Sequence, residues 1–300
     1  MTDNSKEKEK KRSRGLWIVV LLLSLLLLLG GAAVYIFTHP WWVEPLNPSD
    51  YHTQTPTMTA PTVPTETEAP TTQAVPVTEP VTTVPTTAAP TTTTAAPLPD
   101  NPVDFAPLKE INQDVYAWLY IPMGPEKPDI DLPVLQPGPK DNIDYYLHHD
   151  VNRKYLYAGC LYTQPINSMD FTDRVTVIYG HNMLNGTMFS NLPVFRDSKF
   201  FENHEYFYIY TPGHILTYRI AAAIQFDTRH ILNCFNFSDD AVYEDWIENY
   251  ILHPKTMVRN YRSDMDITTD DKLVILSTCL EHGASRYLIE GVLISDELTN

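Results

Sequence analysis

An uncharged apolar run, followed by a Thr/Pro-rich stretch, restricts the globular fold of this chain to its C-terminal part. Residues 15–38 contain no charged side chain, and residues 44–105 are rich in Thr and Pro. A Thr/Pro stretch buries too little apolar surface to offset the entropy lost on ordering, so it forms no packed core. Only roughly the last 195 residues have the pattern of a globular domain, which is enough for one domain with a sizeable core.

Residues 15–38 are long enough to cross a membrane as a single helix. About 20 residues, each rising ~1.5 Å, span a hydrocarbon core of ~30 Å. The run ends in aromatic residues that suit a membrane interface, whereas a cleaved signal peptide, the alternative, has a shorter apolar region. Six basic residues lie within residues 1–14, and none follows the run until Lys109. The positive-inside rule therefore predicts a single-pass protein of the cell membrane with its C-terminal part outside.

The sequence thus predicts four regions. These are a cytoplasmic basic tail at 1–14, a transmembrane helix at 15–38, a Thr/Pro-rich extracellular stalk at 39–103 and a globular domain at 104–300. In a polyproline II conformation, ~50 stalk residues would reach ~150 Å, so we interpret the stalk as a tether or spacer. The chain carries −16 overall and +3 in residues 1–14, so the remainder carries −19. This acidic balance argues against nucleic-acid binding.

The globular part predicts a mainly β fold that closes into a barrel, because many short strands alternate with few helices. Helix-like spacing of apolar residues occurs at Leu108–Leu119 and at Asp240–Leu252, the second with Ser238 or Asp239 as its cap. Strand-like runs are predicted at residues 120–122, 132–135, 156–161, 174–179, 206–210, 215–226, 272–278 and 287–294.

Two segments far apart in the sequence carry the reactive side chains. His181 follows the apolar run Val177-Ile178-Tyr179-Gly180, Cys279 follows Leu276-Ser277-Thr278, and Arg286 opens the next strand. A thiol nucleophile, a proton carrier and a cation for a developing oxyanion are what acyl transfer through a thioester requires. The three side chains therefore predict a cysteine-dependent acyl-transfer site at the strand ends.

Other histidines and cysteines have less context. His282, three residues from Cys279, is the rival base, and His230 lies on a loop without a motif. We interpret His52 and His148 as surface or turn residues. The remaining cysteines are interpreted as small buried hydrophobes, with a disulfide between Cys160 and Cys234 as the alternative. No metal-ligand spacing occurs, so no metal or cofactor is expected.

The chain resembles the sortases of Gram-positive bacteria, and within them class B. The resemblance extends from about Ala117 to Ile294, and its motifs are Trp118-Leu119-x-Ile121-Pro122, Tyr145-Tyr146-Leu147-x-His149-Asp150, Tyr179-Gly180-His181-Asn182-Met183, Gly186-x-Met188-Phe189, Leu276-Ser277-Thr278-Cys279 and Arg286. Asn142 lies one residue farther from Leu147 than in the family pattern. The implied fold is an eight-stranded barrel with N-terminal helices and a helix before the seventh strand.

The resemblance implies a cysteine transpeptidase that cleaves a C-terminal sorting signal of a secreted protein and transfers that protein to an amine of the cell wall. Cys279 would be the nucleophile, His181 the proton donor to the leaving amine and Arg286 the stabiliser of the oxyanion. Ser277, Leu147 and Ile231 fall near family positions that line the peptide groove. No cofactor is implied, and the partners are sorting-signal proteins and the peptidoglycan amine.

Three other functions stay open from the sequence. An exported cysteine hydrolase would use the same three residues with water as acceptor, and a pilin-joining sortase would use an amine of another subunit. A barrel that only binds peptide would not require Cys279. Capture of the acyl group by an added amine separates the transferases from the hydrolase.

Overall fold

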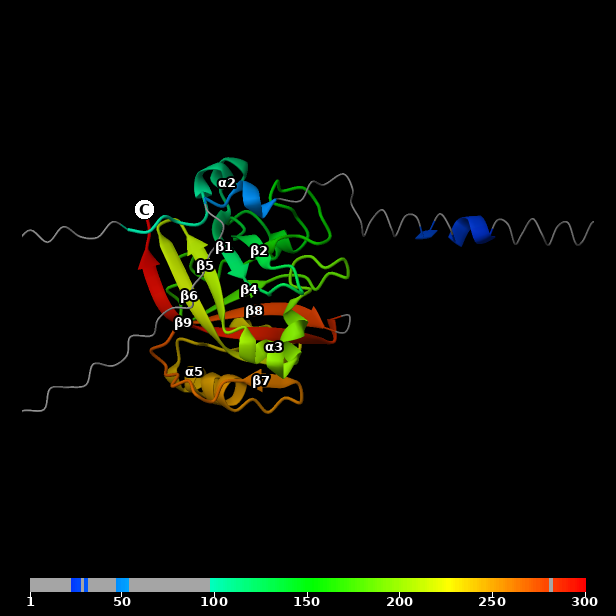
Figure 1. Cartoon of the computed structure of the whole chain (residues 1–300). Coiled ribbons are helices and arrows are strands. Elements are labelled where there is room, and N and C mark those ends of the chain that lie inside the picture. Colours follow the sequence, from blue (N-terminus) through cyan, green and yellow to red (C-terminus); the bar gives the residue numbers. More distant parts are fainter. Residues whose placement is uncertain (1–22, 28–29, 32–46, 54–97, 281–282) are drawn as a thin grey trace, which may run out of the picture.

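The computed structural model describes residues 23–27, 30–31, 47–53, 98–280 and 283–300 (Figure 1). Its helices from residue 47 onward are η1 (Pro48–Asp50), α2 (Phe105–Ile111), η2 (Tyr145–Leu147), η3 (Leu192–Arg196), α3 (Ser198–Asn203), α4 (Ile231–Cys234), α5 (Asp240–Trp246) and η4 (Ile247–Leu252). Its strands are β1 (Val115–Ile121), β2 (Ile130–Leu135), β3 (Leu161–Tyr162), β4 (Val175–Tyr179), β5 (Tyr206–Thr211), β6 (His214–Phe226), β7 (Arg259–Tyr261), β8 (Leu273–Leu280) and β9 (Ser285–Leu298).

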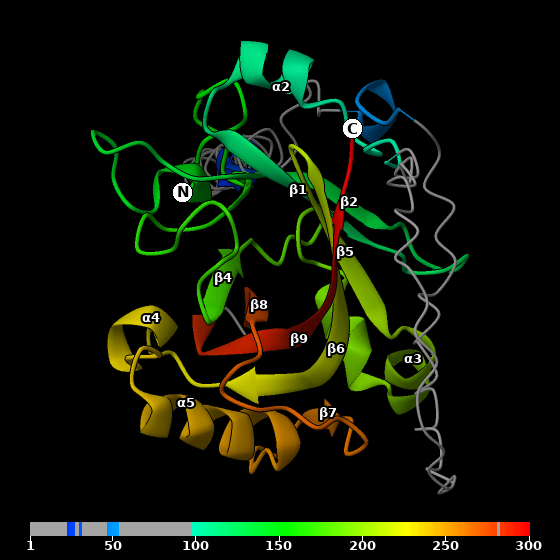
Figure 2. The same cartoon turned by 90° about the vertical axis from the view of Figure 1, so that its left-hand side faces the viewer.

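Eight of these strands form a closed barrel, which confirms the predicted mainly β, eight-stranded architecture. Their order is β5-β1-β2-β3-β4-β8-β9-β6, and pairing of β5 with β6 closes the ring (Figure 2). The short strand β7 pairs with β6 outside the ring. The β2–β3 and β4–β8 pairs are parallel, whereas the other pairs are antiparallel. Because β4 and β8 run side by side in the same direction, their carboxyl ends meet at one edge of the barrel.

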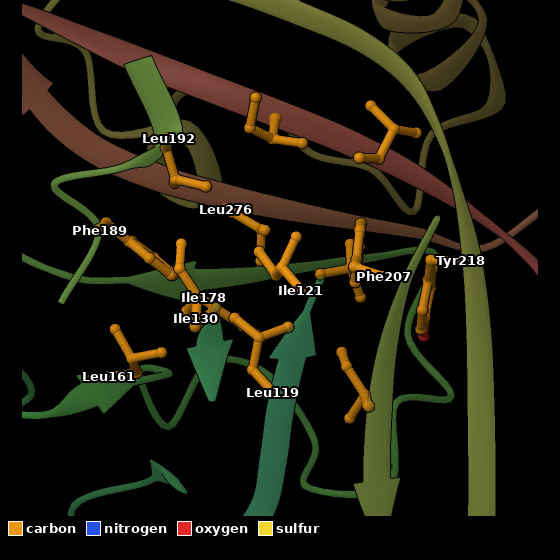
Figure 3. Packing of buried hydrophobic residues seen from close by; sticks show 14 of the residues in the cluster. Leu119, Ile121, Ile130, Leu161, Ile178, Phe189, Leu192, Phe207, Tyr218 and Leu276 are labelled. Carbon is orange, nitrogen blue, oxygen red and sulfur yellow. The ribbon is translucent and has the colours of Figure 1, made fainter. Parts of the chain in front are cut away.

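Aliphatic and aromatic side chains from all around the ring fill its interior (Figure 3). Leu119 of β1, Ile178 of β4, Phe207 of β5 and Leu276 of β8 are fully buried in one cluster. Strand β4 is buried along most of its length, and β8 along nearly all of it. The two strands that precede His181 and Cys279 are therefore rigidly packed.

The helix predicted at Asp240–Leu252 covers the outside of the barrel beside β6 and β9 (Figure 2). Asp239 caps it by accepting a hydrogen bond from the Ala241 amide, and Trp246 is fully buried. The first seven residues form α5, and the chain continues as a π-helix through η4. The prediction is confirmed as one helical segment, although the sequence did not indicate the change of pitch.

The helix predicted at Leu108–Leu119 is wrong in its second half. Helix α2 ends at Ile111, Asn112 turns the chain by binding the Asp114 amide, and β1 begins at Val115. All seven residues of β1 are buried. A strand buried on both faces needs apolar residues throughout, so its pattern also satisfies a helical period. The run at 156–161 likewise contributes only its last residue to a strand, β3.

The predicted membrane span lies mostly outside the described residues. Among those that are described, no helix is long and apolar enough to cross a membrane. The N-terminal helices implied by the family resemblance correspond here to the one-turn η1 and to α2.

A glutamic acid is fully buried between β9 and the outer helix. Glu290 Oε2 accepts a hydrogen bond of 2.8 Å from Trp246 Nε1, and Oε1 has no partner among the described residues. Burial raises the pKa of Glu290 to about 8. Since the unfolded carboxyl titrates near ~4.3, the folded chain alone holds this proton between about pH 5 and 8.

Stability is therefore expected to fall as the pH rises through this window. The Glu290 contribution has a slope of up to about 1.4 kcal/mol per pH unit, because the folded state binds the additional proton. Glu290→Gln stays neutral and is expected to remove this slope, measured by urea unfolding of a soluble chain that begins at residue 47. Glu244→Gln, on the exposed side of α5, should keep it. An equal slope in Glu290→Gln and the parent chain would contradict the prediction.

Candidate active site

The parallel register of β4 and β8 brings the predicted nucleophile and proton carrier to the same edge of the barrel. Tyr179 pairs with Ser277 at the end of the ladder. His181 and Cys279 each lie two residues beyond this pair, His181 just past the end of β4 and Cys279 in the last part of β8. Each side chain is partly exposed, although the strands before them are buried.

Cross-strand hydrogen bonds hold these two strand ends together. Thr278 Oγ1 donates to the Gly180 carbonyl at 2.7 Å, and Asn182 Nδ2 donates to the Cys279 carbonyl at 3.1 Å. A Cβ atom on Gly180 would lie 2.5 Å from the Leu161 side chain, so a larger residue would displace the strand end. The Gly-His and Thr-Cys dipeptides therefore fix the backbone on both sides of the site.

Arg286 contacts the sulfur of Cys279 directly. The antiparallel pairing of β8 with β9 places the two residues opposite each other. The guanidinium Nη1 donates to Cys279 Sγ at 2.8 Å. A guanidinium keeps its positive charge at all physiological pH values and presents several donors in a rigid fork. It can therefore contact both the attacking sulfur and the oxygen on which charge develops.

His181 is oriented by a backbone carbonyl and by two aromatic rings. Its Nε2 is 3.0 Å from the Leu147 carbonyl oxygen. Because a carbonyl only accepts, Nε2 carries the proton of this hydrogen bond, and Nδ1 remains for the reaction. The ring stacks on Tyr157 at 5.4 Å and lies 5.2 Å from the ring of His148. Tyr157 also stacks on His148, so the three rings pack as one group.

Burial lowers the pKa of His181, and the nearby His148 lowers it further, while the hydrogen bond to Leu147 opposes both effects. His148→Gln removes a neighbouring group that repels a proton when it is charged. We expect this change to raise the pKa of His181, measured by NMR titration of the imidazole and by the pH dependence of kcat/KM. Proton donation by His181 would then persist to higher pH.

His149→Gln is the matched control for that change. His149 stacks on Tyr145 and bonds its carbonyl, whereas His181 packs against His148 and Tyr157. The His149→Gln variant is expected to leave the pKa of His181 unchanged. A pKa of His181 that stays constant or falls in His148→Gln would contradict the electrostatic role of His148.

A groove of about 230 Å³ is lined by all six residues that the sequence predicts for the site, the three catalytic and the three substrate-binding ones. Its lining residues are Asp144, Leu147, Tyr162, Gln164, Tyr179, Gly180, His181, Thr228, Arg229, His230, Ile231, Ser277, Thr278, Cys279 and Arg286. Ser277 and Ile231 are buried in its wall, and Leu147 is half-buried. Asn142 is not among the lining residues, and it instead binds the Asp144 amide. Among the residues described, no group of His, Cys, Asp or Glu could hold a metal ion.

Several neighbours of the site were not predicted from the sequence. His148 was interpreted as a surface residue, Tyr157 fell within a predicted strand, and neither lies in a motif that points to His181. His230 lines the groove, and its buried Nε2 has no partner among the described residues. His282 lies outside the described residues.

The cysteines other than Cys279 lie away from the groove lining. All three cysteines are free, so the disulfide considered between Cys160 and Cys234 is absent. Cys160 is buried, as interpreted from the sequence, whereas Cys234 is exposed.

Comparison with known proteins assigns this fold and site to a family. The family model described as the Sortase domain matches residues 126–294. Sortase B of Listeria monocytogenes is 30% identical over 193 residues, covering 63% of this chain and 73% of that protein. Sortase B of Staphylococcus aureus is 25% identical over 175 residues, covering 58% of this chain and 67% of that protein. The X-ray structure of Clostridium perfringens sortase B has a TM-score of 0.55 at 29% identity, covering 64% of this chain and 100% of that one.

The chain therefore belongs to the sortase family, a family of cysteine transpeptidases. Its curated relatives and structural neighbours are sortases B, and the chain is a class B sortase.

Proposed function

We propose that this sortase cleaves a C-terminal sorting signal of secreted proteins and transfers them to an amine of the cell wall. The observation that carries the proposal is the 2.8 Å contact between Arg286 and the Cys279 sulfur, in the same groove as His181. Nucleophile, cation and proton carrier thus face one space that is open to a peptide. The general substrate and acceptor classes follow from the family.

In the first half-reaction, the Cys279 thiolate adds to the carbonyl carbon of the scissile peptide bond. Negative charge moves to the carbonyl oxygen, where Arg286 can donate a hydrogen bond as that charge develops. The tetrahedral intermediate then breaks its C–N bond, and the leaving amine takes a proton from His181 Nδ1. A thioester remains on the sulfur, and His181 is left neutral.

In the second half-reaction, an acceptor amine attacks the thioester. His181, now neutral, accepts the proton that the amine loses, and the C–S bond breaks to release the thiolate. A new amide joins the secreted protein to the acceptor. Cys279 is again a thiolate and His181 is again protonated, as at the start of the reaction.

The walls of the groove are suited to an extended peptide. Leu147 and Ile231 offer apolar surface, while Ser277, two residues before the nucleophile, offers a hydroxyl group. We assign peptide recognition to Ser277, Leu147 and Ile231, which line the same space as Cys279.

We further propose that residues 15–38 anchor the enzyme in the cell membrane with its catalytic domain outside. The support is the uncharged apolar run and the basic residues that precede it. An extracellular site would meet secreted substrates and wall amines on the same side of the membrane.

The test uses a soluble chain that begins at residue 47 and a library of quenched peptides resembling sorting signals. Each peptide is incubated with and without an amine acceptor, and products are identified by mass spectrometry. A transpeptidase is expected to yield the amide of the added amine. The peptides that react fastest identify its preferred motif. Cleavage that ignores the amine and yields only the acid would overturn the transfer and favour a cysteine hydrolase.

The acceptor is identified by competition between two amines. A peptide resembling the peptidoglycan stem is offered together with a lysine-containing peptide from a pilus-type subunit. Preference for the stem amine is the expected result. Preference for the subunit lysine would instead indicate a pilin-joining enzyme.

A further inference from the structure

Residues 47–53, near the start of the predicted stalk, pack against the catalytic domain. Residues 47–53 lie beside α2 (Figures 1 and 2). They are about 50 residues away in sequence from the residues that they contact there. His52 and Val103 form an antiparallel bridge. The Thr53 amide donates to the Pro102 carbonyl at 2.7 Å, and the Asp104 amide donates to the Tyr51 carbonyl at 2.8 Å. The backbone of this segment is therefore paired with the residues that enter α2.

The side chain of His52 packs against Trp118 of β1 and Asp131 of β2, contrary to its interpretation as a surface residue. It is only 7% exposed, and its Nε2 lies 2.9 Å from the Asp131 carboxylate. The same carboxylate accepts a hydrogen bond of 2.6 Å from Trp118 Nε1, and the Trp118 ring packs edge-on against His52. The hydrogen bond to Asp131 raises the pKa of His52. Removing the imidazole would leave a largely buried carboxylate without its charged partner, which is costly.

These contacts bring residues 53 and 98, two points inside the stalk predicted at 39–103, to one place. Thr53 Oγ1 donates to the Asn101 carbonyl at 2.6 Å. Leu98 lies only three residues before Asn101 in the sequence. Whatever path residues 54–97 take, they begin and end beside the same face of the barrel. Their length therefore adds nothing to the distance between residue 53 and the catalytic domain.

We propose that residues 47–53 dock permanently on β1, β2 and the entrance to α2, and that this docking holds the catalytic domain close to the membrane. The docking stands on its own contacts, whereas its effect at the membrane rests on the proposed anchor at 15–38. Only residues 39–46 then separate the anchor from the docked segment. Fully extended, they reach roughly 30 Å, compared with the ~150 Å calculated for a linear stalk. The Thr/Pro-rich segment is thus an insertion into the domain and not its tether.

The docking is tested by electron-spin distance measurement on the full chain in nanodiscs. Spin labels are attached to cysteines introduced at the exposed positions Ser49 and Glu110, after Cys234 and Cys279 are replaced by alanine. One short and narrow distance is expected. The double variant His52→Ala, Thr53→Pro lacks the imidazole and the amide donor, and it should give a broad distribution with long distances.

His253→Ala is the matched control, because it breaks an exposed His–Glu pair with Glu248 at the end of η4, away from residues 47–53. It should preserve the narrow distance. A broad distribution in the parent chain, or a narrow one that survives in the double variant, would overturn the proposal.

A second experiment measures the height of the domain by energy transfer from a dye at position 110 to labelled lipid headgroups. Deleting residues 60–90 should leave the transfer unchanged in the parent chain and increase it only in the double variant. Increased transfer on deletion in the parent chain would mean that the stalk is a tether. Failure to insert into nanodiscs would overturn the anchor alone. The proposed reaction is tested separately with peptide, on the parent chain and on the double variant, both of which retain Cys279.

Discussion

Replacing Cys279 with alanine is expected to abolish both cleavage and transfer. Without the sulfur no thioester forms, and loss of a catalytic nucleophile typically lowers kcat by about 10⁴-fold or more. The rate is measured with the preferred quenched peptide at saturating amine. Intact-mass spectrometry should detect the acyl adduct on the parent enzyme and not on Cys279→Ala. Peptide binding is expected to survive, since the walls of the groove are unchanged.

Cys234→Ala is the control for this experiment. Cys234 is the other free thiol with an exposed side chain, and it does not line the groove. Its replacement should leave kcat and the acyl adduct intact. Turnover by Cys279→Ala within tenfold of the parent rate, or an adduct on Cys234, would assign the nucleophile to a different residue.

Replacing Arg286 with alanine should have the second largest effect. The guanidinium contacts the sulfur at 2.8 Å and can reach the oxygen that becomes negative. Loss of one such donor typically lowers kcat by about 10²–10³-fold. Arg286→Lys is expected to recover only part of this, because an ammonium retains the charge but not the rigid fork of donors. The measurement is kcat, and KM should change much less than kcat.

Arg229→Ala distinguishes this effect from a general loss of positive charge in the groove. Arg229 lines the same space, but Asp227 holds its guanidinium at 2.7 Å. Its loss is expected to affect KM more than kcat. A decrease in kcat as large as that of Arg286→Ala would show that net charge, and not a specific contact to the reacting atoms, is what matters.

Features that depend on neighbouring residues in the sequence could be predicted. The strands before His181 and Cys279 were recognisable because each is a short apolar run that ends at a polar turn. Their pairing was not visible in either run by itself, and it entered through the resemblance to a known family. The structure adds the register of Tyr179 with Ser277, which makes neighbours of residues far apart in the chain.

Features that depend on distant contacts could not be predicted. Strand β1 was mistaken for a helix because burial on both faces removes the alternation that distinguishes a strand. Tyr157 and His148 reach His181 only because the connection between β2 and β3 folds back over the site. His52 has no local motif, and its partners Trp118 and Asp131 lie more than 60 residues further along the chain.

The positions of β8 and β9 determine when this barrel can fold. Both strands follow the other seven in sequence, yet β8 lies between β4 and β9, and β9 lies between β8 and β6. Pairings between residues so distant in sequence form slowly and late. A chain that has not yet acquired β9 exposes two unpaired strand edges and lacks Arg286. Arg286 therefore joins the site only when β9 pairs with β8 and β6, and until then Cys279 lacks the guanidinium that contacts its sulfur.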